Sequence, residues 1–150
     1  MRAYSKRLMA LSSITRFNDP TEALRMPFRL LLVDDHQVVR QGLRTLLIGC
    51  PDYDVCGEAA NGEEAVDRVL QLKPDLVLMD ISMPKMNGIE AAQRIRKVSP
   101  ETKIVILSMH DAAQLANEAK RAGADAFVTK ACPIDELLSV VADVCKHLKG

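Results

Sequence analysis

The chain of 150 residues lacks three features that would assign it to a specialised class. Its four cysteines form no Cys-x-x-Cys pair and stand at no spacing from histidine that suits a zinc site. No apolar run approaches the ~20 residues that a membrane-spanning helix needs. Residues 1–27 are basic but have no continuous apolar core, which excludes a secretory signal. The sequence therefore predicts a cytoplasmic protein whose cysteines are reduced, mostly buried thiols.

An excess of charge of one sign is also missing. Lys and Arg total 20, as do Asp and Glu, and the formal net charge is zero. Residues 1–27 contain five basic and two acidic side chains, which leaves fifteen basic and eighteen acidic in residues 28–150. This mildly acidic body has no basic stripe of the kind that grips a phosphate backbone. We therefore do not expect this chain to bind nucleic acid directly.

From Phe28 onward, apolar runs of strand character alternate with segments of helical periodicity. The strands are expected at 28–33, 53–57, 76–79, 104–107 and 126–128, and the helices at 37–48, 62–72, 88–98, 112–122 and 134–148. Each strand is apolar on both faces, as parallel strands covered by helices are. Five such units predict an α/β fold with a doubly wound, five-stranded parallel sheet of order 2-1-3-4-5.

Helical periodicity also predicts which side chains of the first two helices face the sheet. The inward residues of the first helix are expected to be Val38, Val39, Leu43, Leu46 and Leu47. Those of the second helix are expected to be Ala65, Val66 and Val69.

Residues 1–27 stand apart from this pattern. They show little periodicity, contain Pro20 and Pro27, and include Met26 shortly before the first strand. Three interpretations are open: a disordered tail, a helix added to the body, or upstream sequence from a start site assigned too early. We favour the tail or the early start, and we place the single domain at residues 28–150.

Three acidic residues follow the first and third strands. Asp34 and Asp35 end one apolar run, and Asp80 ends another before a loop rich in Pro and Gly. Alone, each acid could serve in a solvated turn or as a helix cap. The carboxyl ends of neighbouring parallel strands meet at one edge, where open α/β folds place their chemistry. Carboxylates that close repel unless a cation joins them, so the sequence predicts a Mg²⁺ site.

The fourth and fifth strands end near two residues that suit a phosphoryl group. Ser108 can donate a hydrogen bond, and Lys130 carries a compact positive charge. A capping serine and a surface lysine are the alternative interpretations. Because both residues are expected at the edge that holds the acids, we predict that the chain handles a phosphoryl group there.

Four motifs in this order resemble the receiver domain of two-component response regulators. They are Leu32-Val33-Asp34-Asp35-His36, Leu78-Met79-Asp80-Ile81-Ser82-Met83-Pro84-Lys85-Met86-Asn87-Gly88, Ile106-Leu107-Ser108-Met109-His110 and Phe127-Val128-Thr129-Lys130. The segments VDDHQVVRQGLRTLL and LKPDLVLMDISMPKMNGIEA also resemble the NarL/FixJ subfamily. The resemblance covers residues 28–148 and implies a CheY-like, flavodoxin-like fold.

The resemblance implies that Asp80 accepts a phosphoryl group from a sensor histidine kinase and becomes a 4-aspartylphosphate. It implies that Asp35 and Asp80 bind Mg²⁺ directly, that Asp34 acts mainly through water, and that the backbone carbonyl of Ser82 completes the site. The product of the reaction is then a conformational state, so the chain is not expected to be an ordinary enzyme.

The resemblance also assigns roles to the later motifs. Lys130 and Ser108 would contact the phosphoryl group. Ser108 and Phe127 would form a switch that changes the face made by the fourth helix, fifth strand and fifth helix. Phe127 has no hydroxyl group, so this switch must work by packing.

Members of this subfamily usually continue into a helix-turn-helix domain that binds DNA. Two interpretations are open: a chain truncated before such an output domain, which we favour, and a stand-alone receiver. The resemblance is also compatible with a homodimer, through either the fourth helix, fifth strand and fifth helix or the first and fifth helices. No surface stripe distinguishes the two faces.

Two other functions share parts of this pattern. A haloacid-dehalogenase-type phosphatase needs Asp-x-Asp after the first strand and a cap insertion, whereas here Asp34-Asp35-His36 follows that strand and every connection is short. A pseudo-receiver that binds partners without phosphorylation would lack an acid or the lysine, and all are present. We therefore predict a phosphoacceptor domain that regulates transcription.

Overall fold

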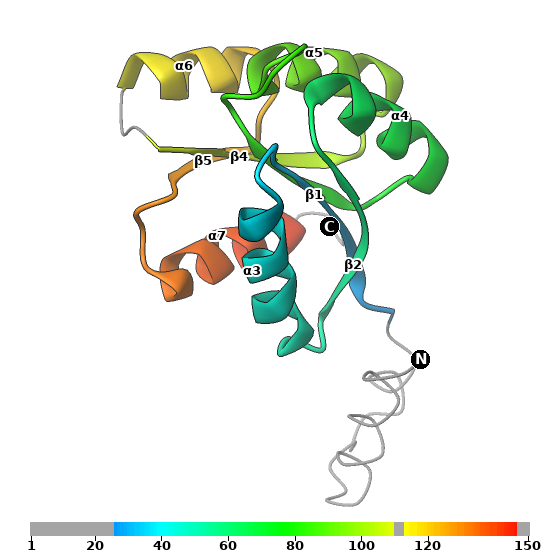
Figure 1. The fold of residues 1–150 in the computed structure, drawn as a ribbon, viewed down its shortest axis with the longest axis vertical. Coiled ribbons are helices and arrows are strands. Elements are labelled where there is room, and N and C mark those ends of the chain that lie inside the picture. The colour runs from blue at the N-terminus through cyan, green and yellow to red at the C-terminus, as the bar shows by residue number, and fades with distance from the viewer. Residues whose placement is uncertain (1–25, 110–112, 147–150) are drawn as a thin grey trace, which may run out of the picture.

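The computed structural model describes residues 26–109 and 113–146 (Figure 1). The strands are β1 (Phe28–Val33), β2 (Tyr53–Ala59), β3 (Leu76–Asp80), β4 (Lys103–Ser108) and β5 (Ala126–Thr129). The helices that alternate with them are α3 (Gln37–Ile48), α4 (Gly62–Leu72), α5 (Gly88–Val98), α6 (Ala113–Arg121) and α7 (Ile134–Lys146). Our predictions for residues 1–25, for position 112 of the fourth helix and for positions 147–148 of the fifth lie outside the described residues.

The five strands form one parallel sheet in the order β2-β1-β3-β4-β5, which confirms the predicted topology. The pairing brings the carboxyl ends of neighbouring strands level with one another. Val33 of β1 lies opposite Met79 of β3, and Ser108 of β4 lies opposite Thr129 of β5. Residues that follow these strands therefore emerge at one edge of the sheet.

Helices cover both faces of the sheet. In Figure 1, α4, α5 and α6 lie on one side and α3 and α7 on the other. Alternate side chains of the central strands enter the two resulting cores, so Leu31 belongs to the first core and Leu32 to the second. Every residue of β3 is buried, because this strand lies in the middle of the sheet and is covered on both faces.

Local capping explains where two of the helices begin. The Asn61 Oδ1 atom accepts from the Glu64 backbone N–H at 2.9 Å at the start of α4. Asn87 does the same for Glu90 at the start of α5, also at 2.9 Å. Such side chains satisfy backbone donors that the first helical turn leaves unpaired. In the part of the chain that the structure describes, no helix is both long and apolar enough to cross a bilayer.

The structure corrects the predicted inward face of α3. Val38 is 78% exposed, while Leu47 is buried and Leu43 is partly buried against the core. Successive residues of a helix turn by about 100°, so Val38 lies on the opposite side of α3 from Leu47. For α4 the prediction is confirmed, because Ala65 and Val69 are buried and Val66 packs against the same core.

The sequence predicted the redox state of the cysteines correctly but not their burial. All four are free thiols, as predicted, but only Cys145 is fully buried. Cys56 is half-buried because β2 is an edge strand, and Cys50 and Cys132 are half-buried because they lie in connecting segments. The expectation of mostly buried thiols is therefore wrong.

Candidate functional site

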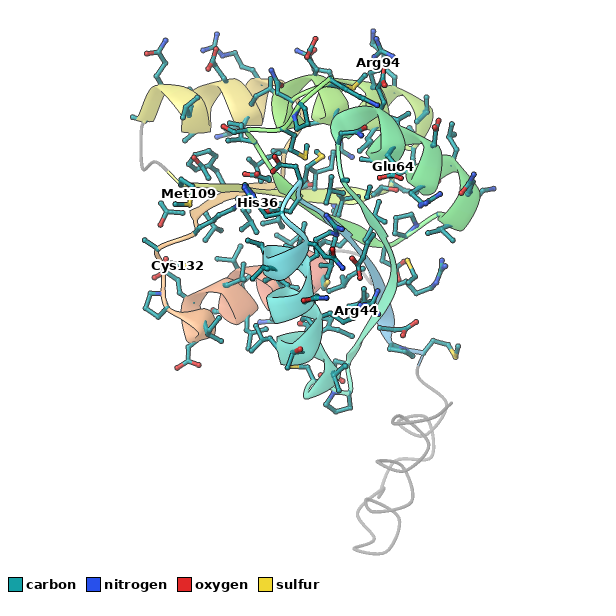
Figure 2. All side chains as sticks on the ribbon, in the orientation of Figure 1. His36, Arg44, Glu64, Arg94, Met109 and Cys132 are labelled. Atoms are coloured by element: carbon teal, nitrogen blue, oxygen red, sulfur yellow. The ribbon has the colours of Figure 1, made fainter. Side chains whose placement is uncertain are left out.

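The residues predicted to form the site gather at the carboxyl edge of the sheet. Each comes from the end of a strand or from the segment just after it: Asp34 and Asp35 after β1, Asp80 at the end of β3, Ser82 just beyond it, Ser108 at the end of β4, Phe127 within β5 and Lys130 after β5. Figure 2 labels His36, Met109 and Cys132, which lie in the segments that follow β1, β4 and β5. Parallel strand direction thus brings together residues that are far apart in the sequence.

Lys130 joins two of the buried carboxylates. Its Nζ atom lies 2.7 Å from Asp34 Oδ2 and 3.3 Å from Asp80 Oδ1. Asp34 is 2% exposed and Asp80 is 3% exposed, so both carboxylates are largely removed from water. The Lys130 backbone N–H also donates to the Ser108 carbonyl at 2.7 Å, which ties the lysine to the end of β4.

Burial and charge act together on the titration of this pair. The pKa of Asp80 is raised, first by burial and then by the negative charge of Asp34, against the opposing effect of Lys130 and a hydrogen bond from the Ser82 backbone. Burial alone would lower the pKa of Lys130, but the hydrogen bond to Asp34 and the charges of both acids raise it. One ammonium group therefore faces two desolvated carboxylates, and the site keeps an excess of negative charge.

Asp35 lies on the exposed side of the same edge, next to His36. His36 Nδ1 is 3.2 Å from Asp35 Oδ1 and 3.3 Å from Asp34 Oδ1. The three consecutive residues offer ligand atoms that all lie within 4.8 Å of one another, close enough to hold a metal ion. Asp80, the other predicted ligand, is linked to this group through Lys130 and Asp34. We did not predict that His36 would contact the acids, although its place directly after them could have indicated it.

The loop after Asp80 is held tightly against the end of β3. The Gly88 backbone N–H donates to the Ile81 carbonyl at 2.9 Å, and Gly62 donates to the Met86 carbonyl at 3.0 Å. Lys85 adopts a left-handed backbone conformation with φ of 68°, which L side chains rarely take. This closed loop keeps Ser82 next to Asp80, where its backbone can contact the carboxylate.

The two residues of the predicted switch lie on adjacent strands. Ser108 is fully buried at the end of β4. Phe127 lies opposite Ile106 of β4 and packs, partly buried, against the core under α4, α5 and α6. Their positions bring a hydroxyl group to the edge of the sheet and an aromatic ring to the neighbouring core.

Residues 30–142 match the sequence model of the response regulator receiver domain. The chain belongs to this family. The receiver is 36% identical over 115 residues to the nitrate/nitrite response regulator protein NarL of Escherichia coli K12, a match that covers 77% of this chain and 53% of NarL. It therefore spans about half the length of several curated relatives, NarL among them. The predicted resemblance to NarL-type regulators is confirmed.

Solved structures agree with this assignment. The receiver resembles a LuxR-family two-component response regulator of Aurantimonas sp. SI85-9A1, with a TM-score of 0.76, 38% identity and coverage of 79% of this chain and 85% of that one. It also resembles a chain of the CheX–CheY–BeF₃–Mg²⁺ complex of Borrelia burgdorferi, with a TM-score of 0.74, 30% identity and coverage of 79% and 90%. Phosphorylation by a kinase is typical of the receiver domain.

Sequence reasoning missed one charged cluster of the receiver, which adjoins the acidic residues. Arg40 of α3 contacts Glu58 of β2, with 2.8 Å between Nε and Oε1. The same guanidinium donates from Nη1 to the backbone carbonyl of Asp34 at 2.5 Å. Arg44 contacts the other Glu58 oxygen at 2.7 Å. The only sequence signal was the spacing of four between the two arginines, which puts them on one helical face.

Proposed function

We propose that this receiver is a phosphoacceptor switch in which Asp80 takes a phosphoryl group from a sensor histidine kinase. The observation that carries the proposal is the position of Lys130 Nζ between the buried carboxylates of Asp34 and Asp80. A partly buried ammonium beside a reactive carboxylate can stay paired at rest and turn to a phosphoryl oxygen after transfer.

In the transfer step, an Asp80 carboxylate oxygen would form a bond to phosphorus while the phosphorus–nitrogen bond of the kinase phosphohistidine breaks. The histidine leaves with the electron pair of that bond and takes up a proton. Lys130 would donate from Nζ to the phosphoryl oxygens, and Ser108 would donate from its hydroxyl. Positioning and charge stabilisation would supply most of the rate enhancement, as in other phosphoryl transfers.

We infer that Mg²⁺ is the cofactor and that Asp34, Asp35, Asp80 and the Ser82 carbonyl would hold it. The residues present fit this ion because their donors are all oxygen atoms and their negative charge exceeds that of the one lysine. Bound there, Mg²⁺ supplies positive charge that lowers the repulsion between the acids and an incoming phosphoryl group. The Borrelia relative, solved with BeF₃ and Mg²⁺, supports this assignment.

The phosphorylated state would alter the face made by α6, β5 and α7. A hydrogen bond from Ser108 to the phosphoryl group would draw the end of β4 toward Asp80, and Phe127 would repack beside it. In energetic terms, one new dianion changes the relative populations of two packings of the same fold.

The output of the switch would be control of transcription. NarL and other curated relatives are named as response or transcriptional regulators, and this chain spans about half their length. We propose that phosphorylation acts on a DNA-binding domain outside this chain, with a homodimer formed by the receiver as one route. Contact with DNA would be made by that domain, because the receiver itself carries a mildly acidic balance of charge.

The test is labelling of the purified chain with acetyl phosphate and Mg²⁺, read by intact-protein mass spectrometry. We expect a gain of about 80 Da on the wild type, dependent on Mg²⁺ and sensitive to base, and no gain on Asp80→Asn. If the wild type is not labelled, candidate histidine kinases replace acetyl phosphate as donor. Failure with these donors as well would overturn the phosphoacceptor proposal.

A further inference from the structure

We propose that Arg40 is a positioning residue that holds the acidic loop, residues 34–36, in the conformation that binds a divalent cation. The inference deepens the proposed function and rests on it, because the cation is the one that phosphoryl transfer would use. It assigns a role in metal binding to a side chain that is not itself a metal ligand.

The guanidinium of Arg40 connects the acidic loop to the sheet. Its Nη1 donates to the Asp34 backbone carbonyl at 2.5 Å, and its Nε donates to Glu58 Oε1 at 2.8 Å. The side chain is 15% exposed, so water competes little for these donors. Because a guanidinium is planar and rigid, one group sets the spacing between the carbonyl and the Glu58 carboxylate.

Glu58 is a firm anchor for this connection. Its second carboxylate oxygen accepts from Arg44 Nε at 2.8 Å, and its backbone carbonyl accepts from Arg68 Nε at 3.3 Å. Its backbone lies in β2 opposite Leu32 of β1. Arg40 therefore ties the Asp34 carbonyl to a paired strand and not to another loop.

Two other hydrogen bonds support the acidic loop: the Asp34 backbone N–H donates to the Ala59 carbonyl at 3.1 Å, and the His36 backbone N–H donates to Asp34 Oδ1 at 2.9 Å. Among the described residues, neither of these contacts involves Asp35, the exposed member of the loop. No residue that the structure describes provides a side-chain cap for α3, whose N-cap is His36. Lys130 holds the Asp34 side chain, but among the described residues the Asp35 carboxylate has only the His36 ring, 69% exposed, within ion-pair distance. The Asp34 carbonyl and the Asp35 N–H share one planar peptide unit, so fixing that carbonyl orients Asp35 as well.

The charge of Arg40 and its positioning role predict opposite effects on cation binding. Removing a positive charge near three carboxylates would, by electrostatics alone, tighten the binding of Mg²⁺. Releasing the Asp34–Asp35 peptide would weaken it, because the Asp35 carboxylate would no longer be held beside the Asp34 and Asp80 carboxylates, which Lys130 contacts. The sign of the change in affinity therefore distinguishes the two effects.

The experiment measures Mg²⁺ binding by calorimetry, with no phosphodonor, in the wild type, Arg40→Met, Arg40→Lys and Arg44→Met. Arg44→Met is the matched control: it removes an arginine from the same helix face and the same glutamate, but not from the Asp34 carbonyl. We expect the Kd of Arg40→Met to rise about tenfold, as for other residues that orient metal ligands. Arg40→Lys should weaken Mg²⁺ binding less than Arg40→Met does. Arg44→Met should either leave the Kd for Mg²⁺ unchanged or lower it, because it removes only a positive charge.

A second measurement needs no cation. In the Mg²⁺-free protein, we expect the Asp35 amide resonance to broaden by exchange in Arg40→Met and to stay sharp in Arg44→Met. Thermal unfolding of each variant checks that the fold is intact, and Arg40→Lys serves if Arg40→Met does not fold. Equal weakening in Arg40→Met and Arg44→Met would indicate a general loss of structure and overturn the inference, as would unchanged or tighter binding in Arg40→Met.

The same samples separate this inference from the proposed function. At saturating Mg²⁺, Arg40→Met should accept the phosphoryl group from acetyl phosphate at close to the wild-type rate, since only the affinity for the cation is reduced. A wild type that binds Mg²⁺ but accepts a phosphoryl group from no donor would overturn the phosphoacceptor proposal and leave the role of Arg40 standing. A wild type that binds no Mg²⁺ would overturn the role of Arg40.

Discussion

The backbone carbonyl oxygen of Asp80 lies directly against Gly88, where an added Cβ would overlap it. The same Cβ would come within 2.9 Å of Ile81 Cα, so the atoms in the way are backbone and have little freedom to move. The start of α5 is therefore pressed against the end of β3. This contact sets the loop that brings Ser82 beside Asp80.

Gly88→Ala should destabilise the fold because neither backbone segment can shift without disturbing the sheet. We expect a loss of about 2–3 kcal/mol in the free energy of unfolding, measured by urea denaturation. Gly42→Ala is the matched control, since no described atom lies within 4 Å of a Cβ built at that position of α3. It should gain about 0.5–1 kcal/mol from the better helix propensity of alanine. Equal effects at both positions would contradict the argument.

Lys130→Met should slow phosphorylation of Asp80. Loss of the ammonium leaves the negative charges of Asp34 and Asp80 without their lysine partner. It also removes the proposed donor to the phosphoryl oxygens. We expect the rate of labelling by acetyl phosphate at saturating Mg²⁺ to fall about 100-fold. Lys103→Met serves as the control, because Lys103 begins β4 and so lies at the opposite end of that strand from the site. A normal rate in Lys130→Met would exclude the proposed role of the lysine.

Glu58 should make the stability of the receiver depend on pH. Burial alone would raise the pKa of this carboxyl, but hydrogen bonds from Arg40 and Arg44 lower it below its ordinary value of 4.5. A lowered pKa means that the stabilisation is present above pH 4.5 and is lost as pH falls through the folded-state pKa. Glu58→Gln should therefore cost about 1 kcal/mol at neutral pH and much less in acid. Urea denaturation at both pH values checks this, and a cost independent of pH would contradict it.

Tyr53 should lose its proton at a higher pH than an ordinary tyrosine. Burial, followed by the nearby charges of Cys145 and Asp52, raises its pKa to about 12. The chain contains two tyrosines, so Tyr4→Phe leaves Tyr53 as the only phenol. We expect its absorbance titration to centre near 12 in the native protein, against about 10 in urea. Because the folded-state pKa is the higher one, stability should fall as pH rises between these values. A native midpoint near that of the unfolded chain would refute this assignment.

Much of the fold could be predicted because local signals mark its boundaries. The helices at Gln37–Ile48, Gly62–Leu72 and Gly88–Val98 have the predicted bounds. The strands were predicted too short where pairing, not apolar character, sets their length. β2 continues through the polar Glu58 to Ala59 because Ala59 pairs with Val33 at the end of β1.

The site was only partly predictable. Its acids, its serine and its lysine could be placed at one edge because parallel strands bring their carboxyl ends together. The link between Arg40, Glu58 and the Asp34 carbonyl could not, because it depends on the register of β1 and β2, which shifts at an irregularity between Leu30 and Leu31. Gly57, within β2 at the shift, was the one sequence signal for it, because a glycine inside a strand often marks a bulge.

The sequence by itself determined the order of strands and helices, the edge at which the acids, Ser108 and Lys130 gather, and the family of the protein. These follow from apolar periodicity, strand direction and short motifs, all of which are local in the chain. Only the tertiary structure decided that Lys130 lies closer to Asp34 than to Asp80, that Val38 faces outward and that Arg40 donates to the Asp34 carbonyl. Such contacts join residues as far as 96 positions apart. They are set by how the helix layers pack on the sheet.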